Sequence, residues 1–348
     1  MEKREKIIVG ISIGDLNGIG SEIIIKTFED NRILDFCTPV IFASVKTFSY
    51  LRKHFKSNIA FHGIDTLAKV AHGKFNVFNI WKEAVPIQFG TEDTTIGTYA
   101  IKSFTAATQA LKKGRIDVLV TAPINKANIQ SESFNFPGHT DYLNQELEGT
   151  SLMFMVTETL KVGLLTDHVP VKDVSKTISK ELIRSKIDTI HESLIKDFGI
   201  RRPKIAVLGI NPHTGDNGVI GKEDDELLRP ILKSIKASGK LVFGPYAADS
   251  FFGSDNYLKF DAVVASYHDQ GLIPFKTLAF GKGVNFTAGL NKIRTSPDHG
   301  TAYEIAGKGE ADNSSFKEAL YAALEIFKRR VSYERLTAKP LQKQPKKI

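Results

Sequence analysis

The residues from 261 to 312 contain the densest series of side chains that could bind or transform a ligand. An apolar, β-branched run at 261–266 is typical of a buried strand, and a polar run at 267–270 follows where that strand should end. Open α/β sheets bind ligands beyond the carboxyl ends of their strands, so we expect a site here. Its candidate members are interleaved with glycines and are Lys276, Asn285, Arg294, Asp298 and His299.

The cations of this series predict an anionic ligand. Arg294 can hold a carboxylate or a phosphate through two parallel hydrogen bonds, and Lys276 can act as a point charge. Asn285 would be a neutral hydrogen-bonding partner. Lys276 could accept or relay a proton if its pKa lies near neutrality. Taken one at a time, these residues could equally be polar loop residues.

Three histidines each come shortly after a predicted strand. They are His168 after 162–165, His213 after 205–210, and His268 after 262–265. Parallel strands place their carboxyl ends along one edge of a sheet, so the three imidazoles could converge there. An open site of three histidines is the pattern of a catalytic divalent metal, for which zinc suits the ligands best and magnesium, manganese or cobalt stay possible. A single histidine in such a place is more often a hydrogen-bonded loop residue.

Other segments predict the elements that must position these side chains. An apolar strand at 7–13 runs into a glycine-rich turn at 14–22, which lacks the spacing of the dinucleotide and P-loop fingerprints. A periodic helix is expected at 95–113, and Gly114 follows it at a position typical of a helix end. A buried strand is expected at 117–121. Alternating strands and helices of this kind are typical of an α/β fold.

Bulk properties indicate an ordinary globular enzyme. The 348 residues suffice for one large α/β unit or two subdomains, and 42% hydrophobic and 25% charged residues are usual values. Cys37 is the only cysteine, so no internal disulfide can form and a cytoplasmic location is expected. We expect no membrane span and no signal peptide.

The net charge of +8 raises the question of a nucleic-acid partner. Part of this charge lies in the proline-interrupted segment 339–347, which has no interleaved aromatic residue for stacking on bases. We therefore expect anionic small molecules, and neither nucleic acid nor membrane, as partners. A DNA-binding function would instead require salt-sensitive affinity carried by this tail.

Several motifs resemble one enzyme family. YHDQGLIPFK at 267–276, GVNFTAGLNKIRTSPDHGTA at 283–302 and AGKGEAD at 306–312 are similar to the C-terminal signature of the 4-hydroxythreonine-4-phosphate dehydrogenases, NAD-dependent enzymes of pyridoxal phosphate biosynthesis. TAPINK at 121–126 matches a further family motif. GDLNGIGSE at 14–22 resembles the family's opening motif, with Leu16 where proline is usual, and Asp141 stands where the family usually has glutamate.

The resemblance implies the three-layer α/β/α fold of the isocitrate and isopropylmalate dehydrogenase superfamily. Two interleaved subdomains with a cleft between them would form one catalytic unit over 1–333, and 334–348 would be a basic, flexible tail. The resemblance also implies a homodimer, with the active site in a cleft at the subunit interface and the metal ligands shared between the two chains.

The resemblance also implies a set of site residues. Substrate would contact His139, Thr140, Lys276, Asn285 and Arg294, and Thr140 could at the same time cap a helix. His168, His213 and His268 correspond to the family's metal ligands. Asp249 lies in a family motif at 244–249, which makes it a second residue that could accept or relay a proton, although it could instead cap the helix that follows it. NAD, or NADP in its place, would use the loop formed by His299, Gly300, Thr301 and Ala302.

The predicted reaction is the oxidation and decarboxylation of 4-phosphooxy-L-threonine to 3-amino-2-oxopropyl phosphate. A metal-bound alcohol is more acidic and would transfer hydride to NAD, and the resulting β-keto acid would lose carbon dioxide. Related enzymes act on 4-phosphoerythronate or 4-phosphothreonate, which are the first alternative. A metal-dependent phosphate-handling transferase of the same fold, without redox chemistry, is the second.

Overall fold

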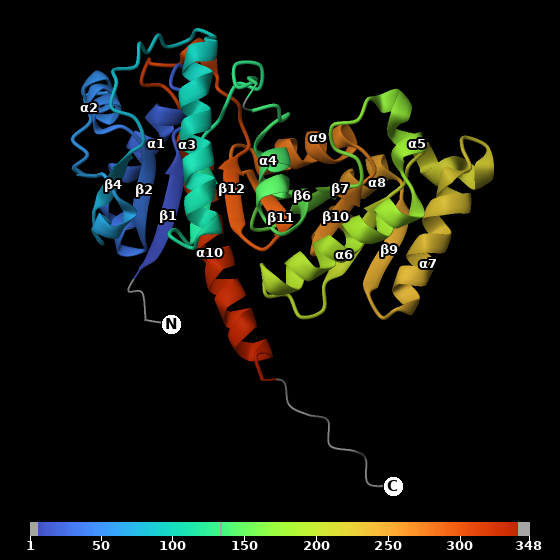
Figure 1. The fold of residues 1–348 in the computed structure, drawn as a ribbon. Coiled ribbons are helices and arrows are strands. Elements are labelled where there is room, and N and C mark those ends of the chain that lie inside the picture. Colours follow the sequence, from blue (N-terminus) through green and yellow to red (C-terminus); the bar gives the residue numbers. More distant parts are fainter. Residues whose placement is uncertain (1–5, 133, 340–348) are drawn as a thin grey trace.

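The computed structural model describes residues 6–132 and 134–339, which form a mixed twelve-stranded sheet between two layers of helices (Figure 1). The strand order is β3-β4-β2-β1-β5-β12-β11-β6-β7-β10-β8-β9. The strands are β1 (Ile7–Ser12), β2 (Cys37–Ala43), β3 (Phe61–Ile64), β4 (Phe75–Asn79), β5 (Val118–Thr121), β6 (Gly149–Val156), β7 (Lys161–Leu164), β8 (Lys204–Leu208), β9 (Leu241–Tyr246), β10 (Ala262–Ala265), β11 (Val284–Leu290) and β12 (Ile293–Pro297).

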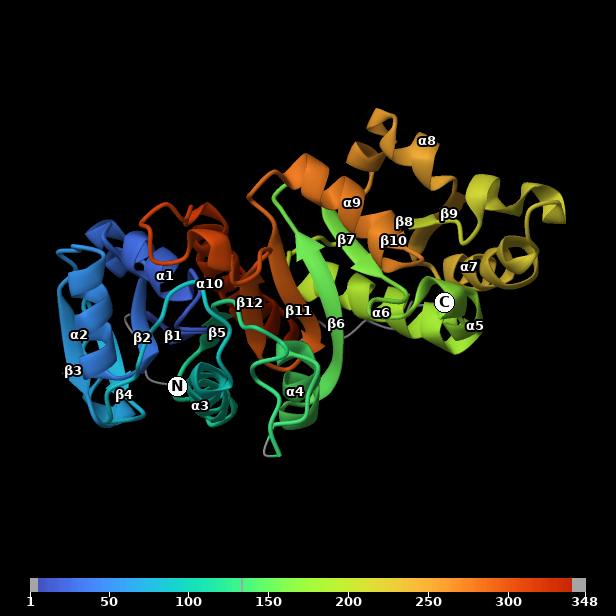
Figure 2. The same cartoon turned by 90° about the horizontal axis from the view of Figure 1, so that it is seen from above.

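The sheet consists of two parallel halves that run in opposite directions. The first half is β3-β4-β2-β1-β5-β12, and the second is β7-β10-β8-β9. Between them, β11 pairs antiparallel with both β12 and β6, and β6 pairs antiparallel with β7. Figure 2 shows these central strands standing between the two halves. The reversal means that the strand ends of the two halves point to opposite edges of the sheet.

Helices cover both faces of the sheet. They are α1 (Gly20–Phe28), α2 (Val45–His54), α3 (Thr94–Lys112), α4 (His139–Glu146), α5 (Val174–Thr177), α6 (Lys180–Lys196), α7 (Arg229–Ala237), α8 (Ala248–Phe252), α9 (His268–Ala279) and α10 (Ser314–Thr337). On one face, a continuous apolar core joins α1, α2, α10, α6 and α7 to the sheet. On the other, α3 and α4 cover the first half, and α8 and α9 cover the second. The three-layer α/β/α architecture is therefore confirmed.

Alternation along the strands explains the two cores. In β1, Ile8 belongs to the core under α3, and its neighbour Val9 belongs to the core of the opposite face. In β10, Val263 and Val264 are divided between the two faces in the same way. Successive side chains of a strand point to opposite faces, so an unbroken apolar strand is what a doubly covered sheet requires.

The predicted elements around the motifs are confirmed. The strands at 7–13 and 117–121 and the helix at 95–113 all form within one residue of their predicted limits. Two strands in the polar region before Gly90, β3 and β4, gave no recognisable pattern. Across the part of the chain that the structure describes, no helix is both long and apolar enough to cross a bilayer.

The final helix differs from its prediction. The pattern Ser315-Phe316-Lys317-Glu318 in the sequence is typical of a capping box before a helix at 320–331, but α10 begins at Ser314 and its N-cap residue Asn313 makes no side-chain hydrogen bond. The Ser315 hydroxyl instead donates to the carbonyl of Gly283. α10 extends to Thr337, so the first residues of the predicted tail at 334–348 are helical, and residues 340–348 lie outside the described range.

Candidate active site

A cavity of about 650 Å³ lies where the two halves of the sheet meet. Its walls come from the segment after β5, the start of α4, the central strands β6 and β11, the end of β12, and the segment after β7. The lining residues used below are Lys126, His139, Thr140, Asp141, Met153, Asp167, His168, Asn285, Arg294, Ser296, His299 and Gly300. Four of the five predicted substrate residues, all except Lys276, thus share a cavity with two predicted cofactor residues and one predicted metal ligand.

Arg294 on β12 is the central charge of this cavity. Its side chain is 3% exposed and donates hydrogen bonds to the hydroxyls of Thr121 and Thr287. Among the described residues, no carboxylate lies within ion-pair distance of the guanidinium. Burial lowers the pKa of Arg294 to about 9, because the charged form has lost its hydration. A buried cation held only by neutral groups is a site prepared for an anion.

His139 presents a second donor to the same space. Its Nδ1 accepts a hydrogen bond of 2.9 Å from Nη2 of Arg294, and its ring packs against Phe104 with centroids 4.4 Å apart. Burial and the neighbouring cations Arg294 and Lys126 lower the pKa of His139 well below its usual range, so the ring is neutral. A neutral ring that accepts at Nδ1 carries its proton on Nε2. That Nε2 is buried and has no protein partner among the described residues.

Two more buried polar atoms at this cavity lack partners within the described part of the chain. They are Oδ1 of Asn285 on β11 and Nε2 of His299, which follows β12. Buried polar atoms are almost always hydrogen-bonded, and an exception calls for an unseen ligand or water. Together with Nε2 of His139, these atoms supply one free acceptor and two imidazole groups around one space. The arrangement favours a small polar ligand that carries both an anionic group and a hydrogen-bond donor.

Several lining residues were missed by the sequence analysis. Lys126 adds a second cation at the end of β5, and Asp141 and Asp167 add carboxylates. The TAPINK motif contains Lys126 and could have indicated it. Thr140, the predicted substrate contact, lines the cavity inside α4, whose N-cap is Gly138, so the prediction of a threonine cap is wrong.

Lys276 lies at the margin of this region and does not line the cavity itself. It sits on α9, and its ammonium is 3.2 Å from Oδ1 of Asp298 and 3.3 Å from the Asp298 carbonyl. Asp298 follows β12 directly and precedes His299, which does line the cavity. Lys276 is therefore connected to the site through Asp298.

Asp249 is not brought to the site. It is exposed in the first turn of α8 and is absent from the residues that line the cavity. The N-cap of α8 is Ala247, so Asp249 does not cap the helix either. Its appearance in a family motif gave no information on which way the side chain faces.

The predicted cofactor loop rests on the glycine-rich opening turn. The carbonyl of Thr301 accepts a hydrogen bond from the backbone N–H of Ile19, and a Cβ at Gly18 would lie 2.8 Å from that carbonyl. Only glycine allows this close approach. The Tyr303 hydroxyl donates to the buried carboxylate of Asp15 at 2.7 Å, and Asp15 also accepts from the backbone N–H of Asn17, as a turn-forming aspartate does.

A second anchor holds the far end of this loop. Glu22 of α1 accepts from the backbone N–H of Ala311, and the Lys26 ammonium donates to the carbonyls of Gly309 and Ala311. The opening motif and the AGKGEAD motif are thus one structural unit, although almost 300 residues separate them. Ala302 in between adopts a left-handed backbone conformation with φ of 44°.

The three histidines follow neighbouring strands, as predicted, but only two of them meet. The strands β7, β10 and β8 are adjacent and parallel. The rings of His168 and His268 lie 6.0 Å apart between centroids, and Nδ1 of His268 is 2.7 Å from Oδ1 of Asp269. No group of three metal-binding side chains forms within residues 6–132 and 134–339.

His213 lies in a distinct backbone turn. It belongs to the turn Pro212–Gly218, in which residues 213–217 all have positive φ values. Four of these five residues are not glycine, and each left-handed residue of that kind costs about 1 kcal/mol. The three-histidine centre is therefore incomplete in this conformation of the single chain, and we derive no chemical step through a metal.

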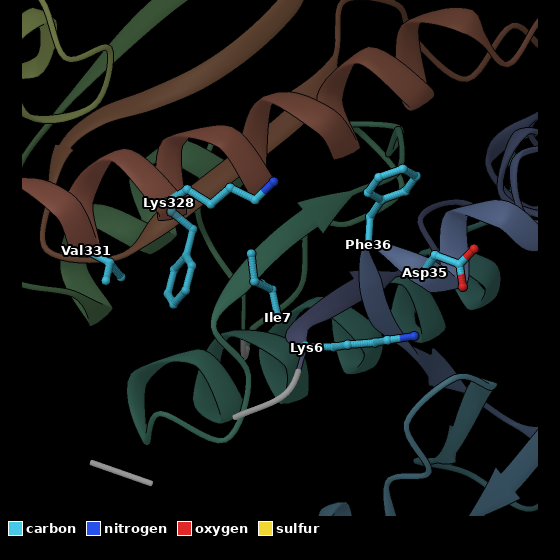
Figure 3. Close-up of a pocket in the computed structure, with 7 residues that line it drawn as sticks. Lys6, Ile7, Asp35, Phe36, Lys328 and Val331 are labelled. Carbon is cyan, nitrogen blue, oxygen red and sulfur yellow. The ribbon is translucent and has the colours of Figure 1, made fainter. Parts of the chain in front are cut away.

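A further hollow of about 350 Å³ lies at the opposite, amino ends of β1 and β2 (Figure 3). Figure 3 shows Ile7 between Phe36 of the first half and Val331 of α10. This hollow contains none of the buried atoms without partners described above. Its position away from the carboxyl ends of the strands also speaks against a catalytic role.

Comparison with known proteins gives one consistent family. Residues 35–323 match the family described as pyridoxal phosphate biosynthetic protein PdxA. The chain is 45% identical over 344 residues to a 4-hydroxythreonine-4-phosphate dehydrogenase of Bacteroides thetaiotaomicron, covering 98% of this chain and 94% of the relative. It is 36% identical over 328 residues to a D-threonate 4-phosphate dehydrogenase of Cupriavidus necator, covering 93% and 98%.

Solved structures agree. The crystal structure of a 4-hydroxythreonine-4-phosphate dehydrogenase from Klebsiella pneumoniae matches with a TM-score of 0.79 at 33% identity. This match covers 92% of the present chain and 99% of the other.

Proposed function

The chain belongs to the PdxA family of pyridoxal phosphate biosynthetic proteins, and we propose that it is a 4-hydroxythreonine-4-phosphate dehydrogenase. It would oxidise 4-phosphooxy-L-threonine with NAD and release carbon dioxide to give 3-amino-2-oxopropyl phosphate. The observation that carries this proposal is the buried guanidinium of Arg294. Among residues 6–132 and 134–339 it has no carboxylate partner, and it lies beside buried polar atoms that have no partner there either.

The cations of the cavity would hold the anionic groups of the substrate. Arg294 offers a planar fork that matches a phosphate or a carboxylate, and the neutral His139 offers Nε2–H beside it. Lys126 adds a positive charge on the same wall. The substrate carries both a phosphate and a carboxylate, so two cationic groups from different elements suit it.

The acceptors of the cavity support an amino acid substrate. Oδ1 of Asn285 is buried without a partner, and Asp141 and Asp167 place carboxylates on the same walls. An ammonium group donates three hydrogen bonds and carries the charge that carboxylates favour, whereas a hydroxyl donates one. D-threonate 4-phosphate remains the alternative substrate, because a relative of 36% identity has that activity in its name.

The family implies a nicotinamide cofactor, and we propose that His299, Gly300, Thr301 and Ala302 bind it. His299 and Gly300 line the cavity, and Nε2 of His299 is buried without a protein partner. The bound cofactor would supply the hydride acceptor. Lys276, rather than the exposed Asp249, is our candidate for accepting or relaying the proton of the substrate hydroxyl, because Lys276 is tied to the residue that precedes His299. Its ammonium would first have to release a proton, since only the neutral amine can accept one.

An assay of reduced cofactor separates the candidate functions. Purified protein with NAD and a divalent metal should produce NADH with 4-phosphooxy-L-threonine. The rate of NADH formation with D-threonate 4-phosphate or 4-phosphoerythronate should be at least about tenfold lower, since the loss of one charged hydrogen bond changes affinity by about that factor. Higher activity with either acid phosphate would move the assignment to that substrate. No NADH with any of them would support the non-redox transferase.

We also propose a divalent metal bound by His168, His213 and His268. The proximity of two of the rings and the neighbouring positions of the three strands support this proposal. His213 would have to approach the other two, and the left-handed turn that carries it is the segment whose conformation would change.

Metal content provides the test. Protein purified without chelator should contain about one divalent ion per chain by elemental analysis, since three imidazoles make one site. His168→Ala and His268→Ala should each lower metal affinity by at least about tenfold. His54→Ala is the matched control, because His54 is exposed and bonds the carbonyl of Gly307 in the first half. Equal metal content in all three variants would contradict the proposed ligands.

The homodimer remains a prediction, and we propose that α9 contributes to its interface. Ile273, Leu278 and Phe280 are 63%, 46% and 89% exposed, which is unusual for large apolar side chains gathered on one helix and its end. A second copy placed against α9 would lie next to Lys276.

Light scattering tests this interface. The protein should have about twice the mass of one 38.5 kDa chain, and Phe280→Asp should shift it toward one chain because a buried unpaired charge is costly. Leu336→Asp is the control, since Leu336 is 77% exposed near the end of α10. A monomeric wild-type protein would exclude the dimer. The cytoplasmic location likewise stays a prediction.

A further inference from the structure

Asp298 is a further candidate residue of this site, and its contacts connect Lys276 to the cavity. It is 18% exposed and joins the two halves of the molecule: it follows β12 of the first half, and its partner Lys276 lies on α9 of the second. The Lys276 ammonium contacts Asp298 twice, at Oδ1 and at the main-chain carbonyl. An ammonium has three donors, so this arrangement leaves one N–H of Lys276 for another group.

The position of Asp298 is fixed independently of Lys276. Its backbone N–H donates to the Ser315 hydroxyl at 3.1 Å, and that hydroxyl donates to the carbonyl of Gly283 at 3.0 Å. The carboxylate fits against Gly283, where a Cβ would lie 2.9 Å from Oδ2. Asp298 is thus held by the start of α10 and by the residue before β11, both of which are rigid parts of the fold.

The charged and titratable groups nearest to this carboxylate are cations or imidazoles. Lys276 faces it from α9, His299 adjoins it in the chain, and His268 acts on it from the start of α9. Burial alone would disfavour the negative charge and raises the pKa of Asp298, whereas Lys276 opposes that effect. The pair is therefore mutually dependent: Asp298 orients Lys276, and the positive charge of Lys276 favours the ionised form of Asp298.

We propose that Asp298 is a positioning residue for the reaction, which holds the Lys276 ammonium beside the His299 loop and directs its remaining N–H toward the anionic substrate. This inference rests on the proposed function, because it concerns the same site. It explains why a lysine that is 54% exposed can have one defined orientation, although a free lysine side chain samples many rotamers. Preorganisation of this kind lowers the entropic cost of binding.

A double-mutant cycle tests the proposal. Asp298→Asn should weaken binding of 4-phosphooxy-L-threonine about tenfold, in KM and in Kd measured by calorimetry, which is the usual order for one charged hydrogen bond. The KM for NAD should change less than about twofold. In a Lys276→Met background, Asp298→Asn should have less than about a twofold further effect, because the ammonium that it positions is gone. Asp298→Glu should restore part of the affinity.

The outcomes are distinguishable. An unchanged substrate Kd in Asp298→Asn, or a tenfold effect that persists in the Lys276→Met background, would overturn the positioning role. A parallel rise in the KM for NAD would show instead that Asp298 supports the fold of the cofactor loop. Thermal unfolding of each variant checks that the protein is folded. If wild-type protein binds the substrate without making NADH, the proposed function fails while the Kd cycle still reports on Asp298.

Discussion

Replacing Arg294 with lysine should reduce kcat/KM for 4-phosphooxy-L-threonine by about 100-fold, because the loss of a buried, charged pair of parallel hydrogen bonds costs about 3 kcal/mol. Lysine keeps the charge but cannot offer two parallel N–H groups to one anion, and it cannot bridge Thr121, Thr287 and His139 at the same time. Initial-rate kinetics with varied substrate would measure the effect, and the KM for NAD should change little.

The matched control for Arg294 is Arg329→Lys. Arg329 is on the exposed side of α10, where it pairs with Glu325, so its replacement should leave kcat/KM within about twofold of wild type. Full activity in Arg294→Lys would mean that the anion is held elsewhere, and Lys126 would then be the first residue to examine.

Replacing Arg294 with methionine should affect the activity and the stability of the protein differently. A buried guanidinium without a countercharge destabilises the free protein, which is also why burial lowers the pKa of Arg294. Arg294→Met should therefore abolish measurable turnover without lowering the thermal midpoint of the ligand-free protein. In addition, substrate should raise the midpoint of the wild type and fail to raise that of the variant.

The largest expected loss of stability comes from a buried ion pair far from the cavity. Arg330 of α10 donates to Asp197 at 2.5 Å and to the carbonyl of Leu290, and Ser193 of α6 donates to the same carboxylate. Both charged side chains are less than a tenth exposed. Asp197→Leu should lower the free energy of unfolding by about 3–5 kcal/mol, because it leaves a buried cation without a partner. Denaturant-induced unfolding would measure this change.

A double variant distinguishes the charge effect from a packing effect. Arg330→Met combined with Asp197→Leu removes both charges, and it should be less destabilised than Asp197→Leu alone. Additive losses in the double variant would contradict the interpretation, because they would mean that the two side chains stabilise the protein separately. A loss below about 1 kcal/mol in the single variant would mean that water reaches the pair.

The sequence predicted the fold best where a strand leads directly into a motif. The strands before residues 14, 122 and 267 are continuous apolar runs, because both of their faces are covered, and such runs are easy to recognise. By contrast, β3 and β4 are short strands in which polar residues and a glycine interrupt the apolar run, and they are the two outermost strands at their end of the sheet. The opposite directions of the two halves could not be predicted either, since pairing partners are distant in the chain.

The sequence indicated which residues could form a site more reliably than it indicated which of them face the cavity. Arg294, His139 and Asn285 surround one cavity, because strand ends and a helix start bring them together. Lys276 and Asp249 lie on helices, where the direction of a side chain depends on the docking angle of the helix, and neither lines the cavity. Lys126 escaped notice because a lysine in a loop is usually solvated.

The path of the chain has a consequence for synthesis on the ribosome. The edge of β5 is covered by β12, and the apolar face beneath β5 by α10, yet these two elements are among the last to be translated. A nascent chain that has already made β1 to β5 therefore exposes an unpaired strand edge until almost the whole polypeptide has emerged, and exposed edges of this kind recruit other chains. Chains terminated before residue 293 should accordingly depend on chaperones or aggregate.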